Sequence, residues 1–148
     1  MYNYAPEGYS CPFCRIAHDG ENNQIVYRDN AVTAFMSLHD APNNLGQAVV
    51  IPDDHYENIY DLPAPAAAKI HECARAVAMA MKSAYNCDGI SLRQNNGLHG
   101  GQDIWHYHLH IYPRYEGDSF PRLEKVFTPV EKRVECAGQL RSHLVNHA

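Results

Sequence analysis

Three histidines stand at alternate positions in the segment 106–114, which reads HYHLHIYPR. Imidazole is suited to nucleophilic attack and proton transfer near neutral pH, and it is also a common zinc ligand. Because side chains two positions apart on a β-strand point to the same face, we expect the three rings to share one face and the intervening apolar residues to face the core. The histidines are His106, His108 and His110, and the core-facing residues are Tyr107, Leu109 and Ile111.

One metal ion does not account for the whole set. Neighbouring rings on one face of a strand lie about 7 Å apart and the outer pair about 13 Å apart. Zinc requires each ligand nitrogen at about 2 Å, so two rings can converge on one ion but three on a straight strand hardly can. The pattern therefore indicates a site in which at least one histidine does other chemistry than binding the same metal.

A glycine-rich segment, NNGLHGGQD at 95–103, leads directly into the histidines. Glycines at 97, 100 and 101 allow the backbone to approach a ligand closely and to present N–H groups to an anion. An ordinary flexible connection is the alternative, since glycine in a loop is a weak signal by itself. A phosphate held beside a nucleophilic or acid–base histidine is a coherent pairing, and it favours a phosphate site here.

The elements that position these residues follow from hydrophobic periodicity and turn residues. Residues 64–85 predict a long helix, because they are alanine-rich, carry Pro65 in the first turn and repeat apolar side chains at helical spacing. Strands are expected at 25–27, 31–36, 47–51, 90–94 and 104–112, a polar loop at 39–44, and a second helix at 130–146. Mostly antiparallel strands with one long crossing helix indicate the α+β class. The inward-facing helix residues are expected to be Ile70, Ala74, Val77 and Met81, and then Val134, Leu140 and Leu144.

Length and composition bound the class of protein. The 148 residues are 45% hydrophobic and suit a single domain over 1–148, with a tail at about 1–10 and a C-terminal extension at about 116–148. A net charge of -5 provides no basic surface for duplex nucleic acid or an anionic membrane, so neither partner is expected. The first residues lack the features of a signal peptide, and no stretch reads as a membrane helix, so we expect a cytoplasmic protein.

The cysteines fall into two groups. Cys73, Cys87 and Cys136 are scattered along the chain and are expected to be small buried hydrophobes. Cys11 and Cys14 form a C-x-x-C motif. That motif is typical of a zinc site, but a redox pair or two idle thiols would give the same spacing.

The segment GGQDIWHYHLHIYPR resembles the signature of the histidine triad (HIT) family. CPFCRI, VYRDNAVTAFM and VVIPDDHYENIYDL precede it in the order that the family shows. The resemblance implies the HIT-like fold, a five-stranded, mostly antiparallel sheet with one long helix and a C-terminal helix. It also implies a homodimer that binds a small nucleotide and cleaves a nucleoside phosphoramidate or a dinucleoside polyphosphate at the α-phosphate. Nucleotidyl transfer or phosphorolysis, and a nucleotide-binding regulatory module with incidental turnover, are the alternatives.

The same resemblance implies roles for individual residues. His108 would attack the α-phosphorus and form a nucleotidyl-histidine, and His110 would hydrogen-bond the phosphate oxygens or the leaving group. Asn95 and Gln102, with backbone N–H groups around Gly101, would hold the phosphate. The expected base and ribose pocket consists of Phe13, Ile16, Phe35, Ser37 and Leu38. Each of its apolar members could equally be plain core.

Cys11 and Cys14 fit the zinc-binding, bacterial-type branch of the family. By position in that pattern, His55 and His106 would complete a Cys₂His₂ site for one structural Zn²⁺ per chain. Spacing alone does not select His55 over the other histidines. Those alternatives are His39, His71 and His99.

The chain also departs from the family pattern. Asp103 stands where many members have serine or threonine, and a carboxylate there would repel phosphate. Ser37 aligns with an acidic position that often grips the ribose hydroxyls, for which Asp40 is a possible substitute. Gln47 replaces a common histidine, and the segment from 35 to 55 is about two residues longer than usual. The C-terminal extension matches no signature and is expected to serve in packing or dimer contact.

Overall fold

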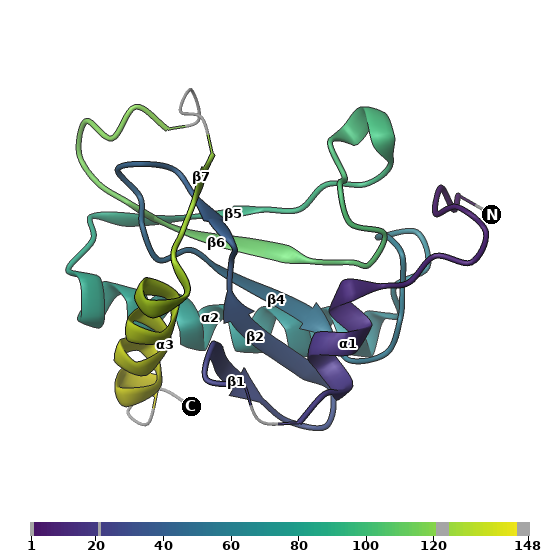
Figure 1. Ribbon diagram of the computed structural model, residues 1–148, viewed down its shortest axis with the longest axis horizontal. Coiled ribbons are helices and arrows are strands. Elements are labelled where there is room, and N and C mark those ends of the chain that lie inside the picture. Colours follow the sequence, from purple (N-terminus) through teal and green to yellow (C-terminus); the bar gives the residue numbers. More distant parts are fainter. Residues whose placement is uncertain (1, 21, 121–124, 145–148) are drawn as a thin grey trace.

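Five antiparallel strands form the central sheet of the protein (Figure 1). The computed structural model describes residues 2–20, 22–120 and 125–144. The sheet strands are β1 Ile25–Arg28, β2 Val32–Met36, β4 Ala48–Pro52, β5 Gly89–Arg93 and β6 Leu109–Arg114, in the order β1-β2-β4-β6-β5. The helices are α1 Pro12–His18, α2 Ala64–Tyr85 and α3 Val130–Leu144, with a 3-10 turn η1 at Leu98–Gly100. The predicted α+β class is confirmed, and β1, β2, β4 and β5 lie within a residue of their expected bounds.

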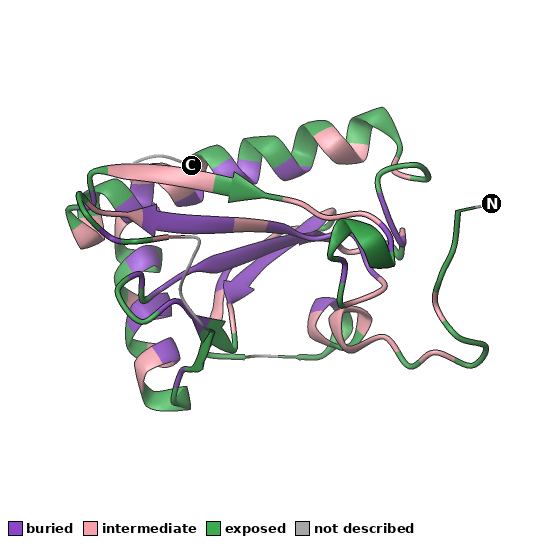
Figure 2. Ribbon diagram, turned by 90° about the horizontal axis from the view of Figure 1, so that it is seen from above, coloured by how far each residue is buried: buried purple, intermediate pink, exposed green. Residues whose placement is uncertain are grey.

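Both faces of the sheet are covered, so β2 and β4 are buried along their whole length. One set of alternate side chains, including Ala34 and Val50, packs with α2 and α3. The opposite set, including Phe35 and Val49, packs with the short helix α1. Figure 2 shows the central strands as buried, with α2 running along one side of them. His110 pairs with Val49 in register, so its side chain belongs to the α1 face.

The long helix α2 has the predicted bounds, Ala64 to Tyr85. Proline near its start is tolerated because the first-turn N–H groups lack partners within the helix. Asn86 ends the helix in the left-handed conformation, with φ 51°. All four side chains that were expected to face inward are buried: Ile70, Ala74, Val77 and Met81. No helix among the described residues is long and apolar enough to cross a membrane.

The histidine strand is shorter than predicted, because β6 begins at Leu109 and not at residue 104. The backbone before it bonds to other parts of the chain: the N–H of Tyr107 donates to the carbonyl of Tyr56 at 2.6 Å, and the N–H of Trp105 donates to the Tyr9 hydroxyl at 3.2 Å. His106 and His108 therefore lie in irregular backbone. The alternation nevertheless holds, and the three predicted core residues all belong to the main hydrophobic cluster: Tyr107, Leu109 and Ile111.

The C-terminal extension contributes one strand of a two-stranded ribbon that local sequence did not reveal. That strand, β7 (Val126–Phe127), pairs antiparallel with β3 (His39–Asp40), which lies in the region 39–44 that was expected to be a loop. The Thr128 hydroxyl donates to the buried carboxylate of Asp40 at 2.5 Å, which fastens the ribbon to the body of the protein.

The C-terminal helix begins where it was predicted. α3 runs to Leu144, and the last part of the predicted helix, to Asn146, lies outside the described residues. Leu140 and Leu144 are buried as expected, whereas Val134 is only half-buried. The three scattered cysteines are also buried as expected: Cys73, Cys87 and Cys136.

Candidate active site and metal site

His108 is buried and oriented by its own backbone. Its Nδ1 lies 2.6 Å from the carbonyl oxygen of His106, and its side chain is 3% exposed. A carbonyl oxygen only accepts hydrogen bonds, so Nδ1 must carry the proton. In the neutral ring, Nε2 therefore holds the lone pair, which is the state that a nucleophile requires.

His110 stands next to His108, with the two ring centres 5.0 Å apart. Its Nδ1 donates to Oε1 of Gln47 at 2.9 Å. Nε2 of Gln47 donates to the carbonyl of His39 at 2.6 Å, which fixes the orientation of the amide. Burial lowers the pKa of His110 to about 3, so the ring is neutral at neutral pH while the site holds no anion.

A cavity of about 290 Å³ opens beside these two rings. Phe13 from α1 makes an edge contact with the His108 ring, at 5.2 Å between centres, and another with Phe35 at 5.3 Å. The structure brings all five residues of the expected base and ribose pocket to this cavity: Phe13, Ile16, Phe35, Ser37 and Leu38. Asp40 does not line the cavity. Its buried carboxylate accepts hydrogen bonds from the Thr128 hydroxyl and from the N–H of Gln47, and burial raises its pKa.

The loop 95–103 is held in shape by its own glutamine. Oε1 of Gln102 accepts from the N–H of Gly97 at 2.9 Å, and Nε2 donates to the carbonyl of Glu57 at 2.6 Å. Asn95 donates to the carbonyl of Gly101 at 3.4 Å. Gly97 and Gly101 have φ values of 73° and 87°, which glycine adopts without strain. The three predicted phosphate-binding residues of the loop do not line the cavity, and their phosphate contacts stay predictions: Asn95, Gly101 and Gln102.

Asp103 occupies the end of that loop and lies next to His108. Its Oδ1 lies 3.6 Å from Nε2 of His108, and its Oδ2 lies 3.9 Å from Nζ of Lys125. The protonated form of the neighbouring His108 imidazole, whose Nε2 faces the carboxylate, lowers the pKa of Asp103 to about 2. With either form of the ring the carboxylate is ionised at neutral pH. All three side chains line the same cavity.

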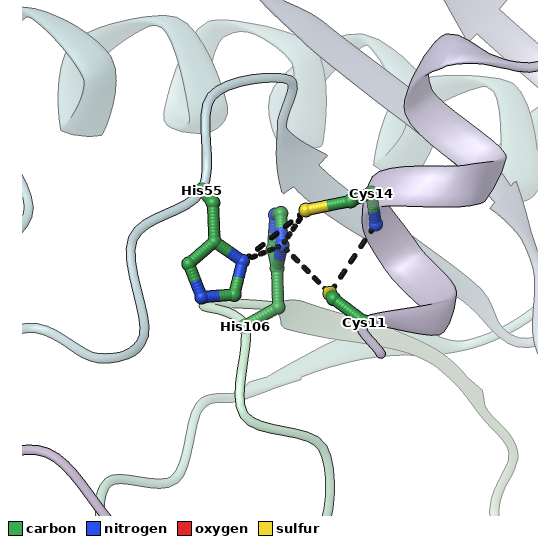
Figure 3. Close-up of side chains that lie close together, drawn as sticks. All are labelled: Cys11, Cys14, His55 and His106. Carbon is green, nitrogen blue, oxygen red and sulfur yellow. Dashed lines mark hydrogen bonds between the residues drawn. The ribbon is translucent and has the colours of Figure 1, made fainter. Parts of the chain in front are cut away.

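A cluster of four potential metal ligands lies beside His108: Cys11, Cys14, His55 and His106 (Figure 3). Nδ1 of His106 lies 3.3 Å from Sγ of Cys11, 3.5 Å from Sγ of Cys14 and 3.2 Å from Nδ1 of His55. All four ligand atoms lie within 4.8 Å of one another. Ligands of a tetrahedral zinc ion stand about 3.3–3.8 Å apart, so these separations suit zinc.

The protonation of the cluster also fits a metal ion. Nε2 of His106 donates to the carbonyl of Pro52 at 2.9 Å, which leaves the lone pair on Nδ1, the atom that faces the sulfurs. Burial lowers the pKa of His106 to about 4, so the ring is neutral as a ligand must be. Burial raises the pKa of Cys14 to about 11, and a nearby cation would be needed to hold its thiolate. Of the other histidines that spacing left open, none belongs to the cluster: His39, His71 and His99.

Sequence reasoning assigned no supporting role to three residues that hold the two sites in place. Gln47 orients His110, and Lys125 reaches Asp103 from the C-terminal extension. Glu57 accepts the backbone N–H groups of Tyr4 and Ala5 at 2.7 and 3.0 Å, so the N-terminal tail is tied to the segment after His55. These contacts join residues far apart in the chain, and no local pattern marks them.

Comparisons with known proteins agree on one family. A 34% identity over 117 residues relates the chain to Protein hit of Bacillus subtilis, covering 78% of this chain and 79% of that protein. Adenylylsulfatase HINT3 of Arabidopsis thaliana is 28% identical over 137 residues, covering 93% of this chain and 68% of its own length. The crystal structure of a Zn-bound histidine triad family protein from Mycobacterium smegmatis superposes with a TM-score of 0.79 at 27% identity, covering 93% of this chain and 94% of the other. The family model described as HIT domain matches residues 20–117, more than half of the chain, and the chain therefore belongs to the HIT domain family.

Proposed function

We propose that this protein hydrolyses a nucleotide at its α-phosphate, with His108 as the nucleophile. The substrate is a nucleoside phosphoramidate or a dinucleoside polyphosphate. The observation that carries the proposal is the hydrogen bond from Nδ1 of His108 to the His106 carbonyl, because it leaves the Nε2 lone pair beside the cavity. The similarity to HINT3, an adenylylsulfatase, supports chemistry at an adenylyl group.

The reaction proceeds in two displacements at phosphorus. The Nε2 lone pair of His108 forms a bond to the α-phosphorus, and the bond from phosphorus to the leaving nitrogen or oxygen breaks. The leaving group keeps the electron pair and takes up a proton from water. Water then attacks the nucleotidyl-histidine and releases its proton to solvent, and the electrons of the N–P bond return to Nε2. The His106 carbonyl stabilises the positive ring of the intermediate through Nδ1–H.

The surroundings of His108 suit a nucleoside monophosphate group. The apolar wall formed by Phe13, Ile16, Phe35 and Leu38 suits a nucleobase, and Ser37 lies where it can meet a ribose hydroxyl. His110 lines the same cavity as His108 and is expected to contact the phosphate oxygens, and the predicted phosphate loop reaches this cavity through Asp103. A cavity of about 290 Å³ admits one nucleotide unit, so the rest of a dinucleotide would extend into solvent.

We assign the Cys₂His₂ cluster to one structural zinc ion per chain, held by Cys11, Cys14, His55 and His106. When bound, zinc would supply a tetrahedral cross-link between α1 and the backbone that leads into β6. His106 then contributes its side chain to the cluster and its carbonyl to the nucleophile. The residues that act on phosphorus are separate from this clamp.

Release of AMP tests the proposal. The wild-type chain, His108→Ala and the matched control His71→Ala, on the exposed face of α2, are incubated with adenosine 5′-phosphoramidate and with diadenosine tetraphosphate. Wild type and His71→Ala should release AMP, and His108→Ala should fall by at least about a thousandfold. Equal slow release by all three proteins would contradict the proposal. ADP formed when inorganic phosphate is added would identify transfer to phosphate.

The homodimer and the cytoplasmic location implied above stay predictions. Sedimentation equilibrium of the full chain measures the first, and fractionation of cells that express it measures the second.

A further inference from the structure

A carboxylate stands beside the proposed nucleophile, and the reaction above gives it no role. Asp103 lies 3.6 Å from Nε2 of His108, the atom that attacks phosphorus. Its side chain is 61% exposed, whereas that of His108 is 3% exposed, so Asp103 lies on the solvent-exposed side of the cavity. A reacting phosphorus sits about 3–3.5 Å from its nucleophile, so the groups attached to it come within a few ångströms of this carboxylate.

Asp103 is a fixed negative charge and not a proton donor. The protonated His108 imidazole lowers its pKa, and beside a neutral ring even the ordinary aspartate pKa leaves it no proton to give to a leaving group at neutral pH. An ionised carboxylate accepts hydrogen bonds only. Asp103 therefore attracts a group that carries N–H donors or positive charge, and it repels a group that carries phosphate charges.

Lys125 opposes Asp103 from the C-terminal extension. Its Nζ lies 3.9 Å from Oδ2 of Asp103, and it lines the same cavity. The lysine directly precedes β7, whose pairing with β3 and whose neighbour Thr128 hold this segment against the body of the protein. An exposed pair at this distance neutralises the carboxylate only in part. The field at the leaving group thus depends on both side chains.

We propose that Asp103 and Lys125 select the leaving group, with Asp103 favouring an amine over a polyphosphate. This inference rests on the proposed nucleophilic role of His108. A phosphoramidate loses an amine, which takes a proton and can donate to Asp103 as the P–N bond breaks. A dinucleoside polyphosphate loses a nucleotide with several negative charges as the P–O bond breaks, and Asp103 repels it. Lys125 weakens that repulsion without cancelling it. The preferred substrate class is therefore the nucleoside phosphoramidate, because of Asp103.

Two charge-removing variants of the full chain test the inference. Asp103→Asn keeps the shape of the side chain, and Lys125→Met keeps most of its length. Lys69→Met, in the exposed Lys69–Glu72 pair on α2, is the matched control for loss of a lysine. The measured quantity is kcat/KM for diadenosine tetraphosphate divided by kcat/KM for adenosine 5′-phosphoramidate, at low and at high salt.

The expected results differ in sign. One unit charge about 5 Å away in a hydrated site changes a rate about tenfold, so Asp103→Asn should raise the ratio by about tenfold. Lys125→Met should lower the ratio several-fold, Lys69→Met should leave it unchanged, and high salt should shrink both shifts. An unchanged ratio in Asp103→Asn overturns the inference. Equal losses on both substrates also overturn it, because they assign Asp103 to positioning His108.

A binding measurement separates this inference from the proposed function. Titration calorimetry of wild type and Asp103→Asn with AMP and with ATP needs no turnover. If wild type hydrolyses neither substrate but Asp103→Asn binds ATP more tightly relative to AMP, the hydrolase proposal fails and the charge selection stands. If wild type hydrolyses neither substrate and the binding of ATP relative to AMP is the same in both proteins, both proposals fail.

Discussion

The carbonyl oxygen of His106 accepts the Nδ1–H of His108 at 2.6 Å, while the His106 side chain belongs to the Cys₂His₂ cluster. One residue thus connects the proposed metal site to the proposed nucleophile. Its ring is fixed at both ends, by the cluster at Nδ1 and by the Pro52 carbonyl at Nε2. The position of the His108 ring therefore depends on the integrity of the cluster.

The zinc assignment predicts a loss of stability and of activity together. Cys11→Ser and Cys14→Ser should lose stoichiometric zinc, and their melting temperatures should fall by about 5–10 °C, as expected for an ion present at about 100 times its Kd. AMP release should fall as well, because the His106 backbone loses its anchor. Metal analysis and thermal scans measure these effects. Cys136→Ala, in the buried face of α3, is a control that should keep its zinc, and full metal occupancy in both serine variants would refute the assignment.

Gln47 should influence catalysis without touching phosphorus. Gln47→Leu removes the acceptor for Nδ1–H of His110, a hydrogen bond worth about 1 kcal/mol, so kcat/KM should fall about five- to tenfold. The exposed Gln139→Leu in α3 is the control, and it should behave as wild type. A steady-state assay with adenosine 5′-phosphoramidate gives the comparison. Wild-type kinetics in Gln47→Leu would mean that His110 needs no orienting partner.

Acid stability should depend on Asp118. The Arg114 guanidinium, in contact at 2.7 Å, holds the pKa of the Asp118 carboxyl well below its usual range, aided by the N–H of Tyr115 and the amide of Asn44. A lowered folded-state pKa contributes stability that is fully present above the unfolded value of about 3.9 and is lost as pH falls toward the folded value. Asp118→Asn should therefore melt below wild type at pH 7, and the gap should narrow below about pH 4. A gap that is constant between pH 7 and pH 3 would contradict this.

The parts of the fold that were predictable are those with local causes. The helix at Ala64–Tyr85 follows from alanine content, apolar spacing and the residues after it, all within one segment. The core-facing alternation of Tyr107, Leu109 and Ile111 likewise depends only on neighbours. The predicted start of β6 was wrong because the backbone N–H of Tyr107 donates a hydrogen bond to the carbonyl of Tyr56, a residue far away in the chain.

The missed elements depend on tertiary contacts. α1 has only seven residues, too few to be stable alone, and it forms against β4 with Ala17 buried. The ribbon of β3 and β7 joins two-residue strands from opposite halves of the chain. The pairing of β3 with β7 brings Lys125 to the cavity, so no local sequence pattern indicates that it lies near Asp103. The resemblance to a known family selected His55 and His106 as companions of the two cysteines, and the structure brings these four residues together. Spacing alone left several histidines open.

Covalent trapping tests the central claim most directly. Wild type, His108→Ala and His110→Ala are mixed with adenosine 5′-phosphoramidate, quenched within the first turnovers, and digested for peptide mass spectrometry. The account predicts one added adenylyl group on His108 in wild type and none in the His108→Ala chain. In His110→Ala the adduct should still form on His108. Turnover by wild type with no adduct under these conditions, or an adduct on a residue other than His108, would contradict the account.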